Sequence, residues 1–230
     1  MFYPFFDPTM ILLIPAIVLS LWAQFKVKGA FARYSEIRAV SGLSAEEVSR
    51  RLLDRNGLSS VRIERVPGEL SDHYDPGAKV LRLSDSVNAS RSIAAIGVAA
   101  HEVGHAVQDK ENYGFLRFRN SIVPVVNLCS MASMPLFFIG LIIGSLNLLN
   151  LGIVLFCGVL VFHLVTLPVE FDASARALRM LRETNILSQK EIGGAKAVLD
   201  AAALTYVAAL VMTVLQLVRL IALSGLRRDE

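Results

Sequence analysis

Long apolar stretches alternate with polar stretches along the chain. The apolar stretches cover residues 8–25, 122–146, 148–167 and 201–223. Each is long and apolar enough for a helix that crosses the hydrocarbon core of a bilayer, which takes about 20 residues. Most charged side chains lie in the polar stretches between them. The pattern predicts a mostly α-helical, multi-span membrane protein with a small polar domain attached.

The distribution of basic residues predicts the orientation of these spans. Basic residues follow the first span (Lys26, Lys28, Arg33, Arg38) and the third span (Arg176, Arg179, Arg182), and none precedes the first. Cytoplasmic loops carry an excess of Lys and Arg. We therefore expect both polar stretches in the cytoplasm and the N-terminus outside. Four full crossings would place Arg227 and Arg228 outside, against this rule, unless the last helix does not cross completely.

The first polar stretch reads as an α+β domain. Ser44 and Glu47 form a capping box that starts a helix, and Asn56-Gly57 ends that helix. Alternating side chains predict two strands, and an Ala- and Ile-rich segment predicts a further helix: 61–65, 79–83 and 92–108. Turn residues at 67–68 and 75–77 separate the two strands.

Composition supports the membrane interpretation and excludes other classes. Hydrophobic residues make up 54% of the chain, and the net charge is only +3. No basic stripe with interleaved aromatic residues is present, so we expect no nucleic-acid partner. Cys129 and Cys157 both lie in apolar stretches, and we expect no disulfide between them.

The helix predicted at 92–108 carries a metal-binding motif. His101 and His105 are four residues apart, so a helix places both imidazoles on one face, where they can bind a single Zn²⁺. Glu102 lies beside the first histidine, suited to deprotonate a zinc-bound water rather than to bind the metal. This His-Glu-x-x-His spacing is the signature of zinc metalloproteases.

A catalytic zinc site needs a third protein ligand and one open position. The chain has only two other histidines, His73 and His163, so a carboxylate becomes the candidate. Glu170 and Asp172 follow the third span directly, in the segment 167–174.

These two carboxylates point to nearly opposite sides of a helix, so only one can face the metal. Asp172 shares its face with Arg176 and Arg179, which indicates a solvated ion-pair stripe. Glu170 shares its face with mostly small side chains that would let a neighbouring helix approach: Ala173, Ser174, Ala177 and Leu181. We expect Glu170 to be the third ligand, with Asp172 as the alternative.

Three motifs in order carry a resemblance to a known family. They are His-Glu-Val-Gly-His-Ala-Val-Gln at 101–108, Leu-Pro-Val-Glu-Phe-Asp-Ala-Ser at 167–174, and Asp-His-Tyr-Asp-Pro at 72–76 ahead of Leu-Arg-Leu-Ser at 81–84. Together they resemble the YugP-type family of neutral zinc metallopeptidases of bacterial membranes. The resemblance covers most of the chain. It implies peptide-bond hydrolysis at the cytoplasmic face of the cell membrane, with Zn²⁺ as cofactor and a peptide or membrane protein as substrate.

The layout is also similar to that of the HtpX-like membrane proteases, in which two spans separate the zinc helix from a helix that carries the third ligand. In those proteases an Asp follows this Glu by four residues, whereas Ser174 stands here. Asp172 or another residue would then fill the role of that Asp.

Other residues have weaker claims to a role in the reaction. His73 could donate a hydrogen bond to the oxyanion of the reaction, as could Tyr74 or Tyr206, although a histidine in a turn-rich stretch is ordinary. His163 lies about two helical turns before Glu170, which is too far for the same zinc and favours a structural hydrogen bond. The strand near 80–83 could bind an extended substrate by its edge, or could simply be packed.

The expected organisation has five parts. They are an N-terminal transmembrane anchor (1–25), a cytoplasmic α+β part with the zinc helix (26–120), a transmembrane helical pair (121–167), a cytoplasmic helix with the third ligand (168–200) and a C-terminal hydrophobic helix (201–230). The first span lacks the basic start and the cleavage site of a signal peptide, so we expect it to be retained.

The sequence predicts a zinc peptidase with Glu102 as general base. A site-2-type intramembrane protease is one alternative, but its Asp-Gly partner motif is missing, since Ala201 follows Asp200. A zinc-stabilised, non-catalytic membrane scaffold is another, which a closed site with four protein ligands would favour. The oligomeric state is not indicated.

Overall fold

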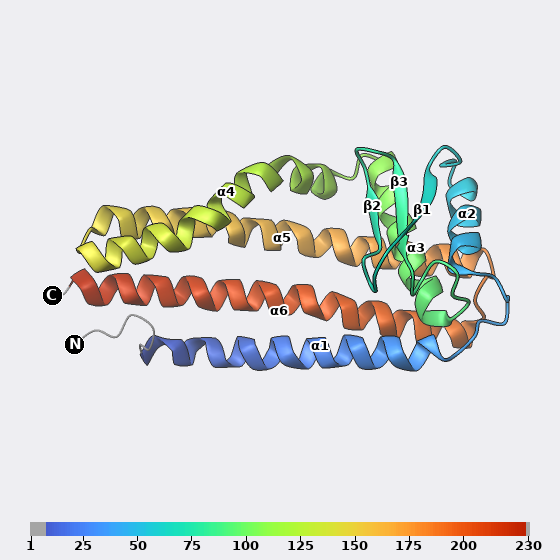
Figure 1. Cartoon of the computed structure of the whole chain (residues 1–230), viewed down its shortest axis with the longest axis horizontal. Coiled ribbons are helices and arrows are strands. Elements are labelled where there is room, and N and C mark those ends of the chain that lie inside the picture. Colours follow the sequence, from blue (N-terminus) through green and yellow to red (C-terminus); the bar gives the residue numbers. More distant parts are fainter. Residues whose placement is uncertain (1–7, 229–230) are drawn as a thin grey trace. The chain divides into compact units, whose positions relative to one another are not determined.

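The computed structural model describes residues 8–228 (Figure 1). A short 3-10 helix, η1 (Pro8–Leu13), leads into the first long helix. The helices are α1 (Ile14–Ser35), α2 (Ala45–Arg55), α3 (Ile93–Lys110), α4 (Gly114–Ile143), α5 (Leu146–Glu183) and α6 (Gln189–Arg228). The strands are β1 (Arg62–Val66), β2 (His73–Asp75) and β3 (Val80–Ser84).

The chain divides into two compact units, which we call the membrane unit and the polar unit. The membrane unit comprises the described residues up to Ala23, Phe118–Leu167, and those from Thr205 onward. The polar unit comprises Gln24–Arg117 and Pro168–Leu204. The range Pro168–Leu204 contains the last part of α5 and the first part of α6, so these parts belong to the polar unit.

The membrane unit contains the apolar parts of α1, α4, α5 and α6, and these four helices are long and apolar enough to cross a membrane. In the most apolar 18-residue stretch of each helix, only 17% to 33% is buried inside the structure. Most of the apolar surface of these helices is therefore exposed, and it needs an apolar solvent such as the interior of a membrane. The boundary between the second and third apolar stretches, predicted near residue 147, lies earlier in the structure. α4 ends at Ile143, and Gly144 makes the turn into α5 with a φ of 71°. Only glycine adopts such a φ without steric cost.

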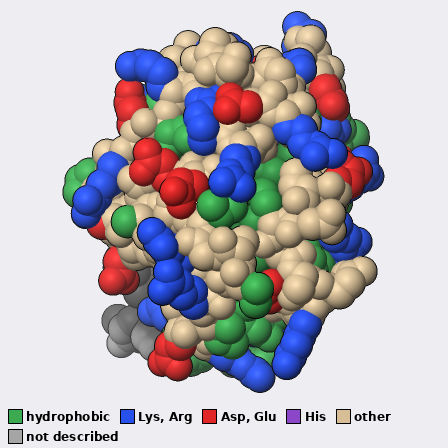
Figure 2. Space-filling model, turned by 90° about the vertical axis from the view of Figure 1, so that its right-hand side faces the viewer, with side chains coloured by type: hydrophobic (Ala, Val, Ile, Leu, Met, Phe, Trp, Pro, Cys, Tyr) green, Lys and Arg blue, Asp and Glu red, His purple; other side chains and the backbone are tan. Residues whose placement is uncertain are grey.

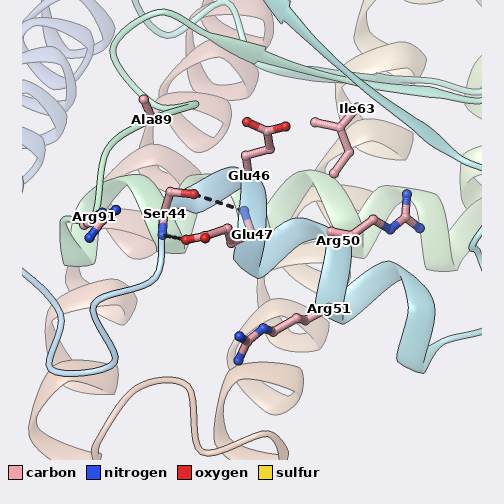
Figure 3. Close-up of a pocket in the computed structure, with 8 residues that line it drawn as sticks. All are labelled: Ser44, Glu46, Glu47, Arg50, Arg51, Ile63, Ala89 and Arg91. Carbon is pink, nitrogen blue, oxygen red and sulfur yellow. Dashed lines mark hydrogen bonds between the residues drawn. The ribbon is translucent and has the colours of Figure 1, made fainter.

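In the polar unit, α2 begins with the predicted capping box. The Ser44 hydroxyl accepts a hydrogen bond from the Glu47 amide, and the Glu47 carboxylate accepts one from the Ser44 amide (Figure 3). These bonds satisfy backbone N–H groups that have no partner within the helix. Leu52 and Leu53 of α2 are fully buried in the core.

The sheet has three strands in the order β1-β3-β2, with β1 parallel and β2 antiparallel to β3. β3 is therefore the central strand, with Leu81 paired both to Ile63 and to Tyr74. The interpretation that the strand near 80–83 binds substrate by its edge is wrong, because both edges of this strand are already paired. The edge strands of the sheet are β1 and β2.

Helix α3 forms the centre of the polar unit and begins at an N-cap, Ser92. Its small side chains are almost completely buried and pack with the sheet, α2 and the part of α5 after Pro168. Charged side chains of both signs are interspersed over the face of the molecule shown in Figure 2. Charged groups avoid apolar surroundings, so such a face is suited to water.

Candidate metal centre

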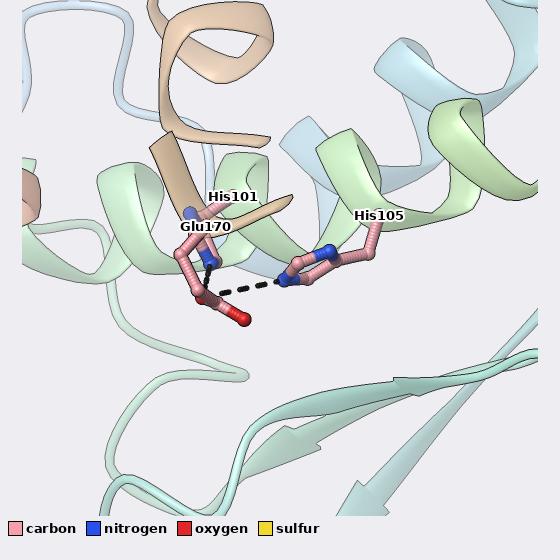
Figure 4. A group of neighbouring side chains, drawn as sticks. All are labelled: His101, His105 and Glu170. Atoms are coloured by element: carbon pink, nitrogen blue, oxygen red, sulfur yellow. Dashed lines mark ion pairs between the residues drawn. The ribbon is translucent and has the colours of Figure 1, made fainter. Parts of the chain in front are cut away.

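Two imidazoles project from one face of α3. His101 and His105 lie one helical turn apart, and their ring centroids are 4.7 Å apart in an edge-to-face arrangement. Both side chains are mostly buried, with exposed fractions of 15% and 11%. The structure thus brings the two predicted histidines together, with their Nε2 atoms directed to a common point (Figure 4).

The side chain that meets them is Glu170 of α5. Its Oε2 lies 3.3 Å from Nε2 of His101 and 3.7 Å from Nε2 of His105. One donor atom from each of the three residues lies within 4.8 Å of the others, and in the described part of the chain no other such His, Cys, Asp or Glu group is found. Three donors this close, from two helices, are arranged to hold one ion.

The close approach of α3 and α5 makes this geometry possible. A Cβ added to Gly104 would lie 2.6 Å from the backbone oxygen of Ala173. Ala173 and Ala177 of α5 are completely buried. The stripe of small residues beside Glu170 therefore does what its pattern predicted, since it lets a neighbouring helix approach the backbone of α5.

Each imidazole has a hydrogen-bond partner at its other nitrogen. Nδ1 of His105 lies 2.9 Å from Oε1 of Gln108, and Nδ1 of His101 lies 3.1 Å from Oγ of Ser174. Such contacts leave Nε2 of both rings for a metal and fix the ring orientation. Sequence reasoning assigned no role to Gln108, although its place three residues after His105 put it on the same helical face.

The sequence places Ser174 in the small-residue stripe beside Glu170 and marks it as a departure from the HtpX-like pattern, but it predicts no contact with a histidine. It occupies the position four residues after Glu170 and contacts the ligand candidate His101. Asp172 does not face the three donors. Its Oδ2 accepts hydrogen bonds from Gln108 and from Arg176, so the predicted ion pair with Arg176 is present.

Glu102 is buried beside the two histidines. Its Oε2 accepts a hydrogen bond of 3.1 Å from the backbone N–H of Tyr74 in β2. Burial raises the pKa of Glu102; positive charge on His101 and His105 would lower it, and the negative charge of Glu170 raises it further. A carboxyl group with a raised pKa beside a metal is suited to accept and return a proton.

His105 is also perturbed. Burial lowers its pKa, but the hydrogen bond to Glu170 and the negative charges of Glu102 and Glu170 more than offset this, so that the net direction is upward. A divalent cation in the same place would reverse this direction, because positive charge opposes protonation of a ligand.

The structure does not bring His73 to the three donors. Its Nδ1 lies 2.9 Å from the backbone oxygen of Ser71, and its Nε2 lies 3.4 Å from a guanidinium nitrogen of Arg82. The next residue, Tyr74, directs its hydroxyl to Asp109 of α3 at 2.7 Å. Successive side chains of a strand point to opposite faces, so the His73 side chain is directed away from α3. Tyr206 belongs to the membrane unit.

The donor set fits zinc. Two imidazole nitrogens and one carboxylate oxygen form a ligand set of catalytic zinc enzymes, in which the fourth position is left for water or substrate. The contacts of Gln108 and Ser174 supply the hydrogen-bond support that such ligands require. The geometry therefore suits a zinc site with a carboxylate, Glu102, close to it.

Comparisons with known proteins agree with this chemistry. The model of a family described as "Putative neutral zinc metallopeptidase" matches residues 9–225. The chain is 50% identical over 219 residues to a protein of Bacillus subtilis (strain 168) named "Putative membrane protease YugP", covering 95% of this chain and 97% of that protein. No solved structure matches.

The family implies Zn²⁺ as cofactor, and the group of His101, His105 and Glu170 could bind it. Four apolar helices agree with the membrane protein named in the comparison. The match extends over nearly the whole chain and includes both the histidine motif and the segment with Glu170. This chain belongs to the family described as "Putative neutral zinc metallopeptidase".

Proposed function

We propose that the chain is a membrane-bound zinc peptidase that hydrolyses peptide bonds, with His101, His105 and Glu170 as zinc ligands and Glu102 as general base. The observation that carries this proposal is the convergence of the three donor atoms next to a buried carboxylate. Two of the donors and the base come from α3, and the third donor comes from α5.

The residues of the chain have distinct tasks in this reaction. Zinc, when bound, polarises the scissile carbonyl and lowers the pKa of a water molecule. The Glu102 carboxylate accepts a proton from the attacking water, whose oxygen forms a bond to the carbonyl carbon. Glu102 then delivers the proton to the amide nitrogen as the C–N bond breaks, which releases an amine and a carboxylic acid. The backbone N–H of Tyr74 orients the Glu102 carboxylate.

The site belongs to the cytoplasmic side of the membrane in our proposal. Residues of both predicted cytoplasmic stretches, His101 in one and Glu170 in the other, are neighbours. Both stretches must then lie on the same side, and the excess of basic residues after the first and third spans favours the cytoplasm. Helix α3 is not among the candidate membrane spans of the described residues, which argues against an intramembrane protease.

The substrate in this proposal is a polypeptide or a membrane protein that presents an extended segment. A buried zinc site next to an edge strand, β2, suits an extended chain better than a folded one.

The experiment compares the full chain in detergent with its Glu102→Gln variant, both loaded with zinc, on fluorescently labelled casein. Loss of a general base costs about 10²–10⁴ in rate. We expect Glu102→Gln to keep the zinc content of the wild-type chain and to lose hydrolysis to this extent. Glu46→Gln, an exposed position of α2, is the matched control. A variant at position 102 that cleaves at the wild-type rate, or a zinc-loaded wild-type chain that cleaves nothing, contradicts the proposal.

A further inference from the structure

Gln108 of α3 makes three hydrogen bonds with its side-chain amide, and its residue is completely buried. Oε1 lies 2.9 Å from Nδ1 of His105. Nε2 donates to the backbone oxygen of Val169 and to Oδ2 of Asp172, both at 2.8 Å. A buried amide with all these partners is held in one orientation, since an unpaired polar atom there would be costly.

The two acceptors decide which end of the amide faces the histidine. A backbone carbonyl oxygen and a carboxylate oxygen can only accept, so the NH₂ group of Gln108 must face them. Its carbonyl oxygen therefore faces His105. An oxygen at this position can only accept, so Nδ1 of His105 carries the proton.

We propose that Gln108 is a positioning residue that holds His105 in the Nδ1–H tautomer and leaves the lone pair of Nε2 for zinc. The inference rests on the proposed function, because it requires His105 to be a zinc ligand. A neutral imidazole donates through one nitrogen and accepts through the other, so fixing one nitrogen fixes the other.

Charged side chains of α5 and α3 in turn fix the position of the Gln108 side-chain amide. Arg176 of α5 donates to the same oxygen of Asp172 that receives the Gln108 bond, and it also pairs with Glu111 at the end of α3. The result is a continuous path of contacts from Glu111 through Arg176, Asp172 and Gln108 to His105. The path joins α3 to α5 next to the metal site, and it keeps Asp172 in its acceptor role.

His101 has a different kind of partner. Oγ of Ser174 can donate or accept, because a hydroxyl group rotates to suit its neighbour. Ser174 therefore supports His101 without specifying its tautomer. Of the two histidines, only His105 has its tautomer fixed by a group that cannot change roles.

The first test replaces Gln108 by methionine, which has similar length but neither donates nor accepts well. Loss of a hydrogen-bond partner of a metal ligand typically costs 10–100-fold in metal affinity. We expect Gln108→Met to weaken zinc binding by roughly this factor, measured by competition with a chelator on the full chain in detergent. Gln189→Met, the same change at an exposed position of α6, should bind zinc like the wild-type chain.

The second test uses rescue, which a role in packing alone would not produce. Gln108→Glu keeps an acceptor for His105, but it loses the donor to Val169 and places a second carboxylate beside Asp172. We expect weaker zinc binding in this variant. Adding Asp172→Asn supplies an amide donor toward the new carboxylate, so the double variant should recover part of the affinity lost by Gln108→Glu.

The outcomes separate this inference from the proposed function. Equal zinc affinity in Gln108→Met and Gln189→Met overturns the positioning role, as does a double variant that binds no better than Gln108→Glu. If Gln108→Met does not fold, the rescue comparison decides alone. His105→Ala is measured beside them: zinc binding like that of the wild-type chain would overturn the zinc site itself. None of these readouts depends on peptide cleavage.

Discussion

His73 and Tyr74 are neighbours in β2, and their side chains point to opposite faces of the sheet. Tyr74 contributes its backbone N–H to Glu102 and its hydroxyl to Asp109. The His73 imidazole instead contacts Ser71 and Arg82, and it is exposed. At the scale of single residues, the backbone of this strand contacts the site and the imidazole does not.

His73→Ala tests the predicted catalytic role of this histidine. A donor to the oxyanion of the reaction is worth about 10²–10³ in kcat. From the position of the imidazole we expect a much smaller loss of casein hydrolysis, with the zinc content unchanged. A loss of the full magnitude in a folded, zinc-loaded variant would show that His73 reaches the substrate and that this expectation is wrong.

The metal-site residues differ in how far the sequence could predict them. The histidine spacing and the small-residue stripe beside Glu170 are local patterns, and both indicated the residues that the structure brings together. Gln108 and Ser174 act through hydrogen bonds whose partners depend on how α3 meets α5. No periodicity reports such a contact, so their roles became visible only in three dimensions.

At the scale of elements, the contact between α3 and α5 depends on Gly104. Its missing side chain lets the backbone of Ala173 approach, and a Cβ would lie within 3.2 Å of three backbone atoms there. Backbone atoms cannot move aside as the end of a flexible side chain can. The two helices would have to separate, and with them the donors that they carry.

Gly104→Ala should therefore destabilise the polar unit by about 1–3 kcal/mol, the usual cost of overpacking, and weaken zinc binding. Gly193→Ala is the matched control, because this helical glycine of α6 has open space around its Cβ position. There, alanine should be neutral or stabilise by up to about 1 kcal/mol. Thermal unfolding of the zinc-free and zinc-loaded chains measures both effects. Equal unfolding midpoints for the two variants would contradict the close-contact argument.

Elements with strong local signals were predicted well, and short ones were not. The capping box at Ser44 fixed the start of α2, and alternation identified β1 and β3 to within one residue. β2 was missed, because its three residues lie in a turn-rich stretch and are held mainly by pairing with β3. The central position of β3 follows from its pairing with β2 on one edge and with β1, which lies farther away in the sequence, on the other.

At the scale of the whole molecule, the metal site constrains the membrane topology. Glu170 and His105 are separated along the chain by the α4–α5 hairpin, yet they are neighbours in the polar unit. In the proposed topology, α4 crosses the membrane once on leaving the polar unit and α5 crosses it once on returning. The turn near Gly144 should then lie on the opposite side of the membrane from the metal site.

Single-cysteine labelling tests this topology. In a background with Cys129 and Cys157 replaced by serine, Asn147→Cys lies in the first turn of α5, next to the hairpin turn, and Glu69→Cys lies in the polar unit. Both positions are exposed. A membrane-impermeant maleimide should label Asn147→Cys in intact cells, and Glu69→Cys only after lysis. Labelling of Glu69→Cys in intact cells would place the site outside and contradict the proposed orientation.

The most direct test of the account locates the metal itself. Anomalous diffraction at the zinc edge, on crystals of the zinc-loaded full chain, identifies the atoms that surround the ion. We predict one zinc ion bound by Nε2 of His101, Nε2 of His105 and the Glu170 carboxylate at about 2.0–2.2 Å, with a fourth position open to solvent. Zinc bound elsewhere, or enclosed by four protein ligands, would contradict the account.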